Sequence, residues 1–223
     1  MGEVRIVSMD SSPFADRLEA GAALAAELTD LKGQEPVILG IPRGAVPMAA
    51  AIARALGGEL DVVIVRKLGS PGNPELAIGA VTEEGEAIVN RELARHTRAS
   101  EEYIAEETRR QVQRIDEARR VFGKARPKLP LGGRVVAIVD DGFATGATMK
   151  AALQSARSEG PKRLIAATPV GAQDAVQAMA EFADEVVCLR APRLFGAVGA
   201  FYQDFGQVSD EEVLQVLRER SGS

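Results

Sequence analysis

The segment at residues 135–148, with the sequence VVAIVDDGFATGAT, constrains the fold of this chain more strongly than any other part. Its five leading apolar residues predict a strand that is buried on both faces of a sheet. A loop of small and hydroxyl residues follows, and residues 149–157 have the composition of a helix. A strand, a tight loop and a helix start together place several backbone N–H groups around one point. The segment therefore predicts a phosphate-binding loop.

Two adjacent carboxylates at the start of this loop indicate that the ligand is more than a phosphate. Asp140 and Asp141 would repel a phosphate, whereas Thr145 and Thr148 can donate hydroxyl hydrogen bonds to it. Carboxylates in this position most simply bind sugar hydroxyls or a divalent cation. We therefore expect a ligand that carries hydroxyl groups or a metal ion beside its phosphate.

The length and composition of the chain limit its organisation and its partners. Its 223 residues suffice for one large domain, or one domain with a small accessory part, and for a full core. The single cysteine, Cys188, excludes an intrachain disulfide and fits a reducing compartment. The N-terminus has no apolar signal core, and no stretch reaches the ~18 apolar residues of a membrane span. We therefore expect a cytoplasmic protein without a membrane partner. The net charge of −5 disfavours nucleic acid as a partner.

Apolar patterns predict helices and strands that alternate along the chain. The predicted helices cover residues 14–31, 48–56, 100–122, 149–157, 172–182 and 210–217. The predicted strands cover residues 37–41, 60–65, 135–139, 163–168 and 185–189, with a hairpin formed by residues 77–81 and 87–89. This alternation predicts an α/β fold with a mostly parallel twisted sheet flanked by helices.

Two basic loops follow the predicted strands at residues 37–41 and 60–65. Arg43 and Gly44 follow residues 37–41, and the pair Arg66 and Lys67 ends the next predicted strand. Ligands of such sheets bind beyond the carboxyl ends of the strands, where these loops would meet. Each arginine alone could instead pair with a surface carboxylate. Together the three loops favour a ligand with several phosphates and a polyol between them.

The segment at residues 135–148 resembles the phosphoribosyl pyrophosphate signature of type I phosphoribosyltransferases. That signature is an apolar run, two acidic residues, two variable ones, and then Ala-Thr-Gly-x-Thr. The sequence Ile41-Pro42-Arg43-Gly44 resembles the family's pyrophosphate loop, and Arg66-Lys67 resembles its basic pair. The whole chain, including residues 71–81, is similar to a bacterial subgroup of predicted phosphoribosyltransferases. The resemblance implies a single domain over 1–223: a core at about 35–190, a hood from about 1–34 and 190–223, and a helical insertion at about 91–128.

The resemblance also implies roles for individual residues. Asp140 and Asp141 would accept hydrogen bonds from the ribose hydroxyls, directly or through Mg²⁺. Five residues would wrap the 5-phosphate of phosphoribosyl pyrophosphate: Ala144, Thr145, Gly146, Ala147 and Thr148. The pyrophosphate group would be held by Arg43, Gly44 and Lys67, with Arg66 as an additional candidate.

The expected chemistry fits these charges. Breaking the C1–O bond of the donor builds positive charge on the ribose and negative charge on the departing pyrophosphate. The carboxylates of Asp140 and Asp141 favour the first charge, whereas Lys67, Arg43 and Mg²⁺ favour the second. The resemblance therefore implies that Asp140, Asp141 and Lys67 are catalytic.

Two features bear on the acceptor base. In family members that use 6-oxopurines, an Asp faces N7 of the base. This chain has Ala144 at that position, so the resemblance disfavours hypoxanthine and guanine as the acceptor base. Adenine and orotate remain open. The loop at residues 194–205 is the richest aromatic cluster of the chain. Phe195 is the candidate for stacking on the base. Phe201, Tyr202 and Phe205 could equally form a small accessory core.

The segment at residues 90–128 is longer than usual for the family and rich in charge, with 11 basic and seven acidic residues. It could be a solvated helix with i, i+4 ion pairs, or a lid or partner surface. The only histidine, His96, lies at its base, as a candidate general acid or base or as an ordinary surface residue.

We therefore expect a phosphoribosyltransferase that transfers 5-phosphoribosyl from phosphoribosyl pyrophosphate to an unidentified nitrogenous base, or the reverse, with Mg²⁺. The main alternative is a non-catalytic regulatory protein that binds phosphoribosyl pyrophosphate or a nucleotide. A third is hydrolysis or phosphorolysis of a related sugar phosphate. Members of the family are often dimers, so a homodimer is one option for the oligomeric state, which the sequence leaves open.

Overall fold

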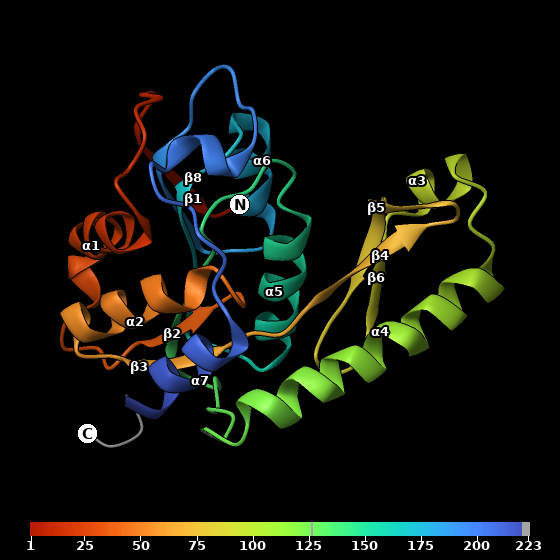
Figure 1. The fold of residues 1–223 in the computed structure, drawn as a ribbon, viewed down its shortest axis with the longest axis horizontal. Coiled ribbons are helices and arrows are strands. Elements are labelled where there is room, and N and C mark those ends of the chain that lie inside the picture. The colour runs from red at the N-terminus through yellow and green to blue at the C-terminus, as the bar shows by residue number, and fades with distance from the viewer. Residues whose placement is uncertain (126, 220–223) are drawn as a thin grey trace.

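The protein is built on a six-stranded sheet, in which all five neighbouring pairs of strands are parallel. A computed structural model describes residues 1–125 and 127–219 (Figure 1). The strands lie in the order β1-β9-β8-β7-β2-β3. Their bounds are β1 Glu3–Ser8, β2 Val37–Gly40, β3 Glu59–Val62, β7 Val135–Val139, β8 Arg163–Val170 and β9 Glu185–Arg190. The expected α/β fold with a mostly parallel sheet is confirmed.

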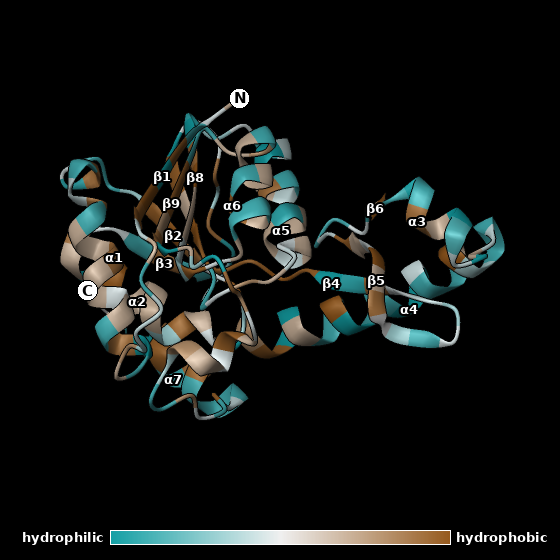
Figure 2. Ribbon diagram, turned by 90° about the horizontal axis from the view of Figure 1, so that it is seen from above, coloured by the Kyte–Doolittle hydropathy of each residue, from teal (hydrophilic) through white to brown (hydrophobic). Residues whose placement is uncertain are grey.

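Helices cover both faces of this sheet and create two cores (Figure 2). One core packs against α1 (Arg17–Glu27), α2 (Ala45–Leu56) and α7 (Asp210–Glu219). The other packs against α5 (Ala147–Ser158) and α6 (Gln173–Ala178). The central strand β7 is buried throughout and contributes alternate residues to the two cores, as a strand with period two must. Three short 3₁₀ helices complete this part: Thr29–Leu31, Met179–Glu181 and Val198–Phe201.

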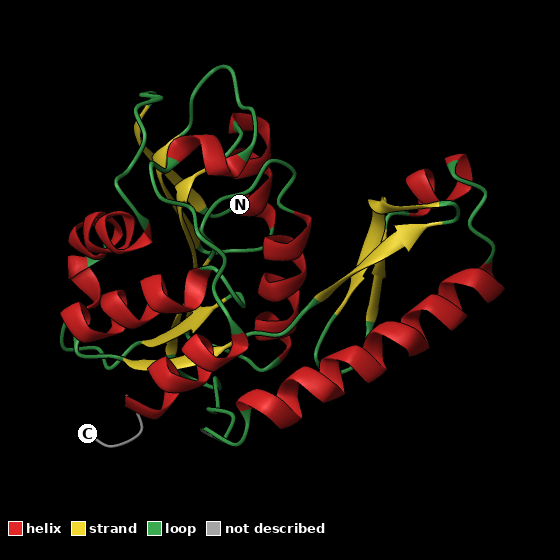
Figure 3. Ribbon diagram, viewed as in Figure 1, coloured by secondary structure: helices red, strands yellow, loops and turns green. Residues whose placement is uncertain are grey.

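A second unit, which we call the arm (residues 66–122), projects from the sheet (Figure 3). It consists of an antiparallel sheet in the order β4-β5-β6, with β4 at Arg66–Ser70, β5 at Asn73–Val81 and β6 at Ala87–Val89. The helices α3 (Arg91–His96) and α4 (Glu101–Phe122) follow. The predicted hairpin is therefore confirmed, and the long α4 lies along it (Figure 1).

The structure corrects the predicted strand at residues 60–65. The chain leaves the main sheet after Val62, and a new strand of the arm begins at Arg66. Arg66 and Lys67 therefore begin an arm strand and do not end a strand of the main sheet. The apolar run at residues 60–65, interrupted only by Asp61, concealed this break, because residues 63–65 stay buried while they cross between the two sheets.

Besides β4 and the 3₁₀ helix at Val198–Phe201, two short elements were not predicted. The edge strand β1 alternates polar and apolar residues over only six positions, and α3 has six residues. Residues 126 and 220–223, which fall in the predicted insertion and hood, lie outside the described residues. The division into core, hood and insertion stays a prediction. Among the helices of the described residues, none has the length and apolar character that a membrane crossing requires.

Helix α4 has a side-chain N-cap and terminal charges that complement its dipole. The Ser100 side chain accepts a hydrogen bond from the Tyr103 N–H, with acidic residues in the first turn and basic residues in the last. Its apolar face is buried through Ile104, Ile115 and Phe122, so α4 is a packed helix with one solvated side. At the far end of the arm, the Tyr103 hydroxyl donates to the Gly69 carbonyl at 3.0 Å.

A charged joint fixes the arm to the main sheet. Arg119 of α4 donates to both carboxylate oxygens of Glu83, in the β5–β6 turn, and its Nη1 lies 3.7 Å from Asp61 Oδ1 in β3. Asp61 is buried and accepts hydrogen bonds from the backbone N–H groups of Val62 and Leu129. Lys128 extends the joint by pairing with Glu84 at 3.0 Å. The side chains of Glu83 and Asp61 are almost fully buried, so Arg119 supplies the positive charge that compensates their carboxylates.

Replacement of Arg119 by alanine should strongly destabilise the protein. Removal of one partner leaves uncompensated buried carboxylates, which costs about 3–5 kcal/mol. We expect a loss of this size in the free energy of unfolding by urea titration. Arg120→Ala is the matched control, since Arg120 is exposed and should change stability by about 0.5 kcal/mol or less. Equal stabilities for the two variants would contradict the role of the joint.

Candidate active site

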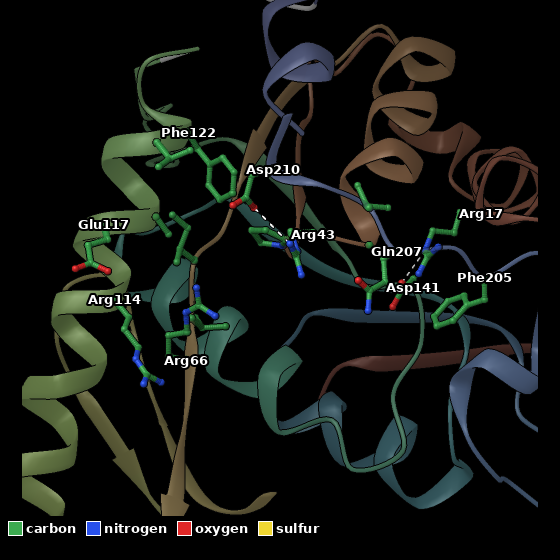
Figure 4. A pocket seen from close by; sticks show the side chains of 17 residues that line it. Arg17, Arg43, Arg66, Arg114, Glu117, Phe122, Asp141, Phe205, Gln207 and Asp210 are labelled. Carbon is green, nitrogen blue, oxygen red and sulfur yellow. Dashed lines mark hydrogen bonds and ion pairs between the residues drawn. The ribbon is translucent and has the colours of Figure 1, made fainter. Parts of the chain in front are cut away.

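A cavity of about 700 Å³ lies where the core, the arm and the C-terminal segment meet at the carboxyl ends of the strands (Figure 4). Arg43 and Gly44 line it after β2, residues 64–66 after β3, and Asp141 after β7. Helix α4 and residues 205–210 form its other walls. The cavity therefore joins the three loops that the sequence singles out.

Asp141 is the centre of this arrangement. Its Oδ2 accepts a hydrogen bond from Arg17 Nε at 2.9 Å, and its carbonyl accepts one from the Tyr202 hydroxyl at 2.5 Å. The carboxylate packs directly on Gly44, where an added Cβ would lie 2.1 Å from Asp141 Oδ2. Only glycine fits at this position without movement of the carboxylate. The loop after β2 and the loop after β7 are thus in contact through one side chain.

Asp140 lies beside it, outside the lining of the cavity. Its Oδ1 accepts a hydrogen bond from the Asp141 N–H at 2.9 Å. Burial and the neighbouring Asp141 carboxylate raise the pKa of Asp140, and burial raises the pKa of Asp141 against the opposing effect of Arg17. Two carboxylates held together in this way favour a cation or hydroxyl donors as partners.

The loop after Asp141 contains backbone N–H groups that are available to donate hydrogen bonds to a ligand. Phe143 is buried and anchors the loop by a bridge to Gly171, while Ala144 and Thr145 are exposed. Gly146 has a φ of 69° and precedes the first turn of α5. Within residues 1–125 and 127–219, the backbone N–H groups of residues 144–148 have no hydrogen-bond acceptor in the protein. This geometry suits an anion at the start of α5.

Of the basic residues expected to hold pyrophosphate, Arg43 and Arg66 line the cavity and Lys67 does not. Arg43 faces the cavity, with its Nη1 3.9 Å from Asp210 Oδ1, and the peptide bond between Pro42 and Arg43 is cis. Neighbouring residues of a strand point to opposite faces, so Lys67 faces away from Arg66. Its expected role stays a prediction.

Arg17 is a site residue that the sequence analysis missed. It occupies the first position of α1, where Asp16 is the N-cap, and it also donates to the Gly206 carbonyl at 2.8 Å. Its guanidinium carbon lies 3.9 Å from the centroid of the Phe205 ring. One sequence feature could have indicated a role for Arg17. It is a basic residue in the first turn of a helix, where the helix dipole disfavours positive charge.

The aromatic residues of the C-terminal segment divide between core and cavity. Phe201 and Tyr202 are buried in the core that packs against α1 and α2, and they do not form a separate accessory core. Phe205 lines the cavity. Phe195 stacks on Phe201 with ring centroids 5.2 Å apart and is not part of the cavity lining. His96 is exposed on α3, at the far end of the arm (Figure 1).

The carboxylates suit Mg²⁺ only in combination with a ligand. Across the described ranges, no group of three or more His, Cys, Asp or Glu side chains could hold a metal ion. Asp140 and Asp141 supply two carboxylates, of which Asp141 already accepts from Arg17. Mg²⁺ is commonly bound by one or two carboxylates together with phosphates of the substrate. The residues present therefore fit Mg²⁺ that arrives with a phosphorylated ligand.

Comparison with known proteins identifies the family. The family model "Phosphoribosyl transferase domain" matches residues 15–195, so the chain belongs to the phosphoribosyl transferase family. Proteins from two strains of Mycobacterium tuberculosis, both named "Putative phosphoribosyl transferase", are 46% identical over 204 residues, or 92% of this chain and 46% of theirs. The chain thus spans about half the length of these curated relatives. The crystal structure of a Thermus thermophilus protein, TT1426, matches with a TM-score of 0.82 and 48% identity, over 94% of this chain and 100% of that one.

Replacement of Gly44 by alanine should disrupt the centre of the site. The added Cβ would overlap Asp141 Oδ2 and lie 3.2 Å from Arg17 Nη2, so the ion pair must move. Overpacking of this kind costs about 1–3 kcal/mol, measured as the free energy of unfolding in urea. The control is Gly196→Ala, where an added Cβ meets no atom within 4 Å. A Gly44→Ala protein as stable as the control would contradict this geometry.

Proposed function

We propose that the protein transfers the 5-phosphoribosyl group from phosphoribosyl pyrophosphate to a nitrogenous base, or catalyses the reverse reaction, with Mg²⁺. Membership of the family supports the type of reaction. The observation that carries the proposal is the shared cavity, in which Asp141 lies against Gly44 and beside Arg43. These groups suit a ligand with a sugar between two phosphorylated ends.

In this proposal, the phosphoribosyl group lies over the β7 loop. Asp140 and Asp141 accept hydrogen bonds from the ribose hydroxyls and stabilise the positive charge that develops on the ribose. The backbone N–H groups and the hydroxyl groups of residues 144–148 bind the 5-phosphate at the start of α5. Mg²⁺, held by Asp140 and Asp141 with the ligand, would neutralise charge on the departing pyrophosphate.

The pyrophosphate end lies on the opposite side of Asp141. Arg43 and Gly44 hold it from the core and Arg66 holds it from the arm, since all three line the cavity. Gly44 lets the ligand approach the backbone closely, and the arginines offer planar pairs of donors to phosphate oxygens. Lys67 remains a candidate for the same group from the neighbouring position of β4.

The acceptor is a base that needs no carboxylate from the β7 loop. Ala144 is exposed and cannot transfer a proton, which disfavours hypoxanthine and guanine in this proposal and leaves adenine and orotate open. Phe195 is the candidate for stacking, half-buried against Phe201. Base and phosphoribosyl group would therefore meet near the ends of β7 and β9.

One observation favours a non-catalytic ligand-binding protein as the second candidate. Arg17 already pairs with Asp141, one of the two carboxylates that catalysis would need. A panel of purine and pyrimidine bases with phosphoribosyl pyrophosphate and Mg²⁺, assayed for pyrophosphate release, separates the two. Release with at least one base supports the enzyme. Binding of phosphoribosyl pyrophosphate without release for any base would support the regulator.

The double variant Asp140→Asn, Asp141→Asn should lose affinity for phosphoribosyl pyrophosphate and Mg²⁺. We expect a loss of at least about 100-fold, because two charge-assisted contacts of about 1.5–3 kcal/mol each disappear. Isothermal titration calorimetry measures the change. The double variant Asp116→Asn, Asp174→Asn alters the net charge equally at two exposed positions outside the cavity lining and should bind normally. An unchanged affinity in the first variant would show that the β7 carboxylates do not bind this ligand.

A further inference from the structure

The arm side of the cavity carries two arginines whose guanidinium groups have no partner among the described residues. Arg66 from β4 and Arg114 from α4 both line the cavity. In the part of the chain that the structure describes, neither guanidinium group takes part in a hydrogen bond, an ion pair or a ring contact. Arg17 and Arg119, by contrast, are each paired with a carboxylate at hydrogen-bond distance.

These two arginines face the same space as Arg43 of the core. Figure 4 shows Arg43 between the arm's arginines on one side and Asp141 with Arg17 on the other. Within the described ranges, Arg43 forms an ion pair with Asp210 alone, at 3.9 Å, and both of these side chains are half-exposed. Three arginines that line one cavity raise its local affinity for anions. The cavity can therefore bind a more highly charged anion than Arg43 alone could bind.

We propose that Arg114 is a phosphate-binding residue, and that the terminal phosphate of the pyrophosphate group binds between Arg43 of the core and Arg66 and Arg114 of the arm. This inference rests on the proposed function and extends it to a residue of α4. Guanidinium groups bind phosphate oxygens by paired, charge-assisted hydrogen bonds, so three of them suit a terminal phosphate. The long helix of the arm then forms a wall of the ligand site.

Helix α4 carries two residues of opposite charge in the cavity, Arg114 and Glu117, whose replacement should change the affinity for pyrophosphate in opposite directions. Glu117 lies three residues after Arg114, lines the same cavity and forms no ion pair with Arg114 among the described residues. Its carboxylate would repel a phosphate bound by Arg114. Loss of the positive charge should therefore weaken pyrophosphate binding, and loss of the negative charge should strengthen it. Arg109 lies on the same helix, is exposed and does not line the cavity, so it is the matched control.

The experiment is a calorimetric titration with inorganic pyrophosphate at a fixed Mg²⁺ concentration. We expect Arg114→Ala to weaken binding about tenfold or more and Arg114→Lys to retain part of the affinity, because lysine keeps the charge without the planar fork. Glu117→Gln should tighten binding about twofold to threefold, and Arg109→Ala should leave it within about twofold. Urea titrations of all variants identify any loss that comes from unfolding.

Equal affinities of the folded Arg114→Ala and Arg109→Ala proteins would overturn this inference. Arg43→Ala makes that result distinct from a failure of the proposed function. If Arg43→Ala abolishes pyrophosphate binding while Arg114→Ala does not, the proposed site stands and the role of α4 falls. If the unaltered protein binds neither pyrophosphate nor phosphoribosyl pyrophosphate, both proposals fall together.

Discussion

The contact between the Asp141 carboxylate and Gly44 is the constraint on which the site depends. It brings the loop after β7 against the loop after β2, at neighbouring strands of the main sheet. Arg17 closes the contact from α1, and Tyr202 holds the Asp141 backbone from the C-terminal segment. Four segments therefore meet at one residue, Asp141. In the proposed function, a ligand that binds Asp141 would contact a site that all four segments shape, which would couple recognition of its sugar and of its pyrophosphate.

The arm gives the site its third wall. Its position follows from buried charge, because Arg119 neutralises Glu83 of the β5–β6 turn and lies beside Asp61 of β3. Buried pairs of this kind add little stability over apolar packing, but they are costly to break, so they favour one arrangement of arm and core. The same helix carries Arg114 into the cavity. Helix α4 thus contributes to both the joint and the cavity lining, at positions separated by little more than one helical turn.

Local patterns predicted most of the fold and the loops of the site. The buried strand β7 and the long helix α4 depend on residues close in sequence, and these predictions agree with the structure. The phosphate-binding role of the loop after β7 stays a prediction. Arg17 and Arg114 could not be found in this way, because only long-range packing brings α1 and α4 to the cavity. The apolar run at residues 60–65 also hid the break between two sheets. Hydrophobicity reports burial there, and it does not report which sheet buries the residues.

The central claim is that phosphoribosyl pyrophosphate binds around Asp141, with its pyrophosphate end in the cavity and its 5-phosphate on the neighbouring loop after β7. A crystal structure of the protein with phosphoribosyl pyrophosphate and Mg²⁺ tests it most directly. The account predicts the ribose hydroxyls at Asp140 and Asp141, the 5-phosphate on residues 144–148, and the pyrophosphate between Arg43 and the arm. A ligand bound elsewhere on the surface, with the Arg17–Asp141 ion pair and the cavity unchanged, would contradict it.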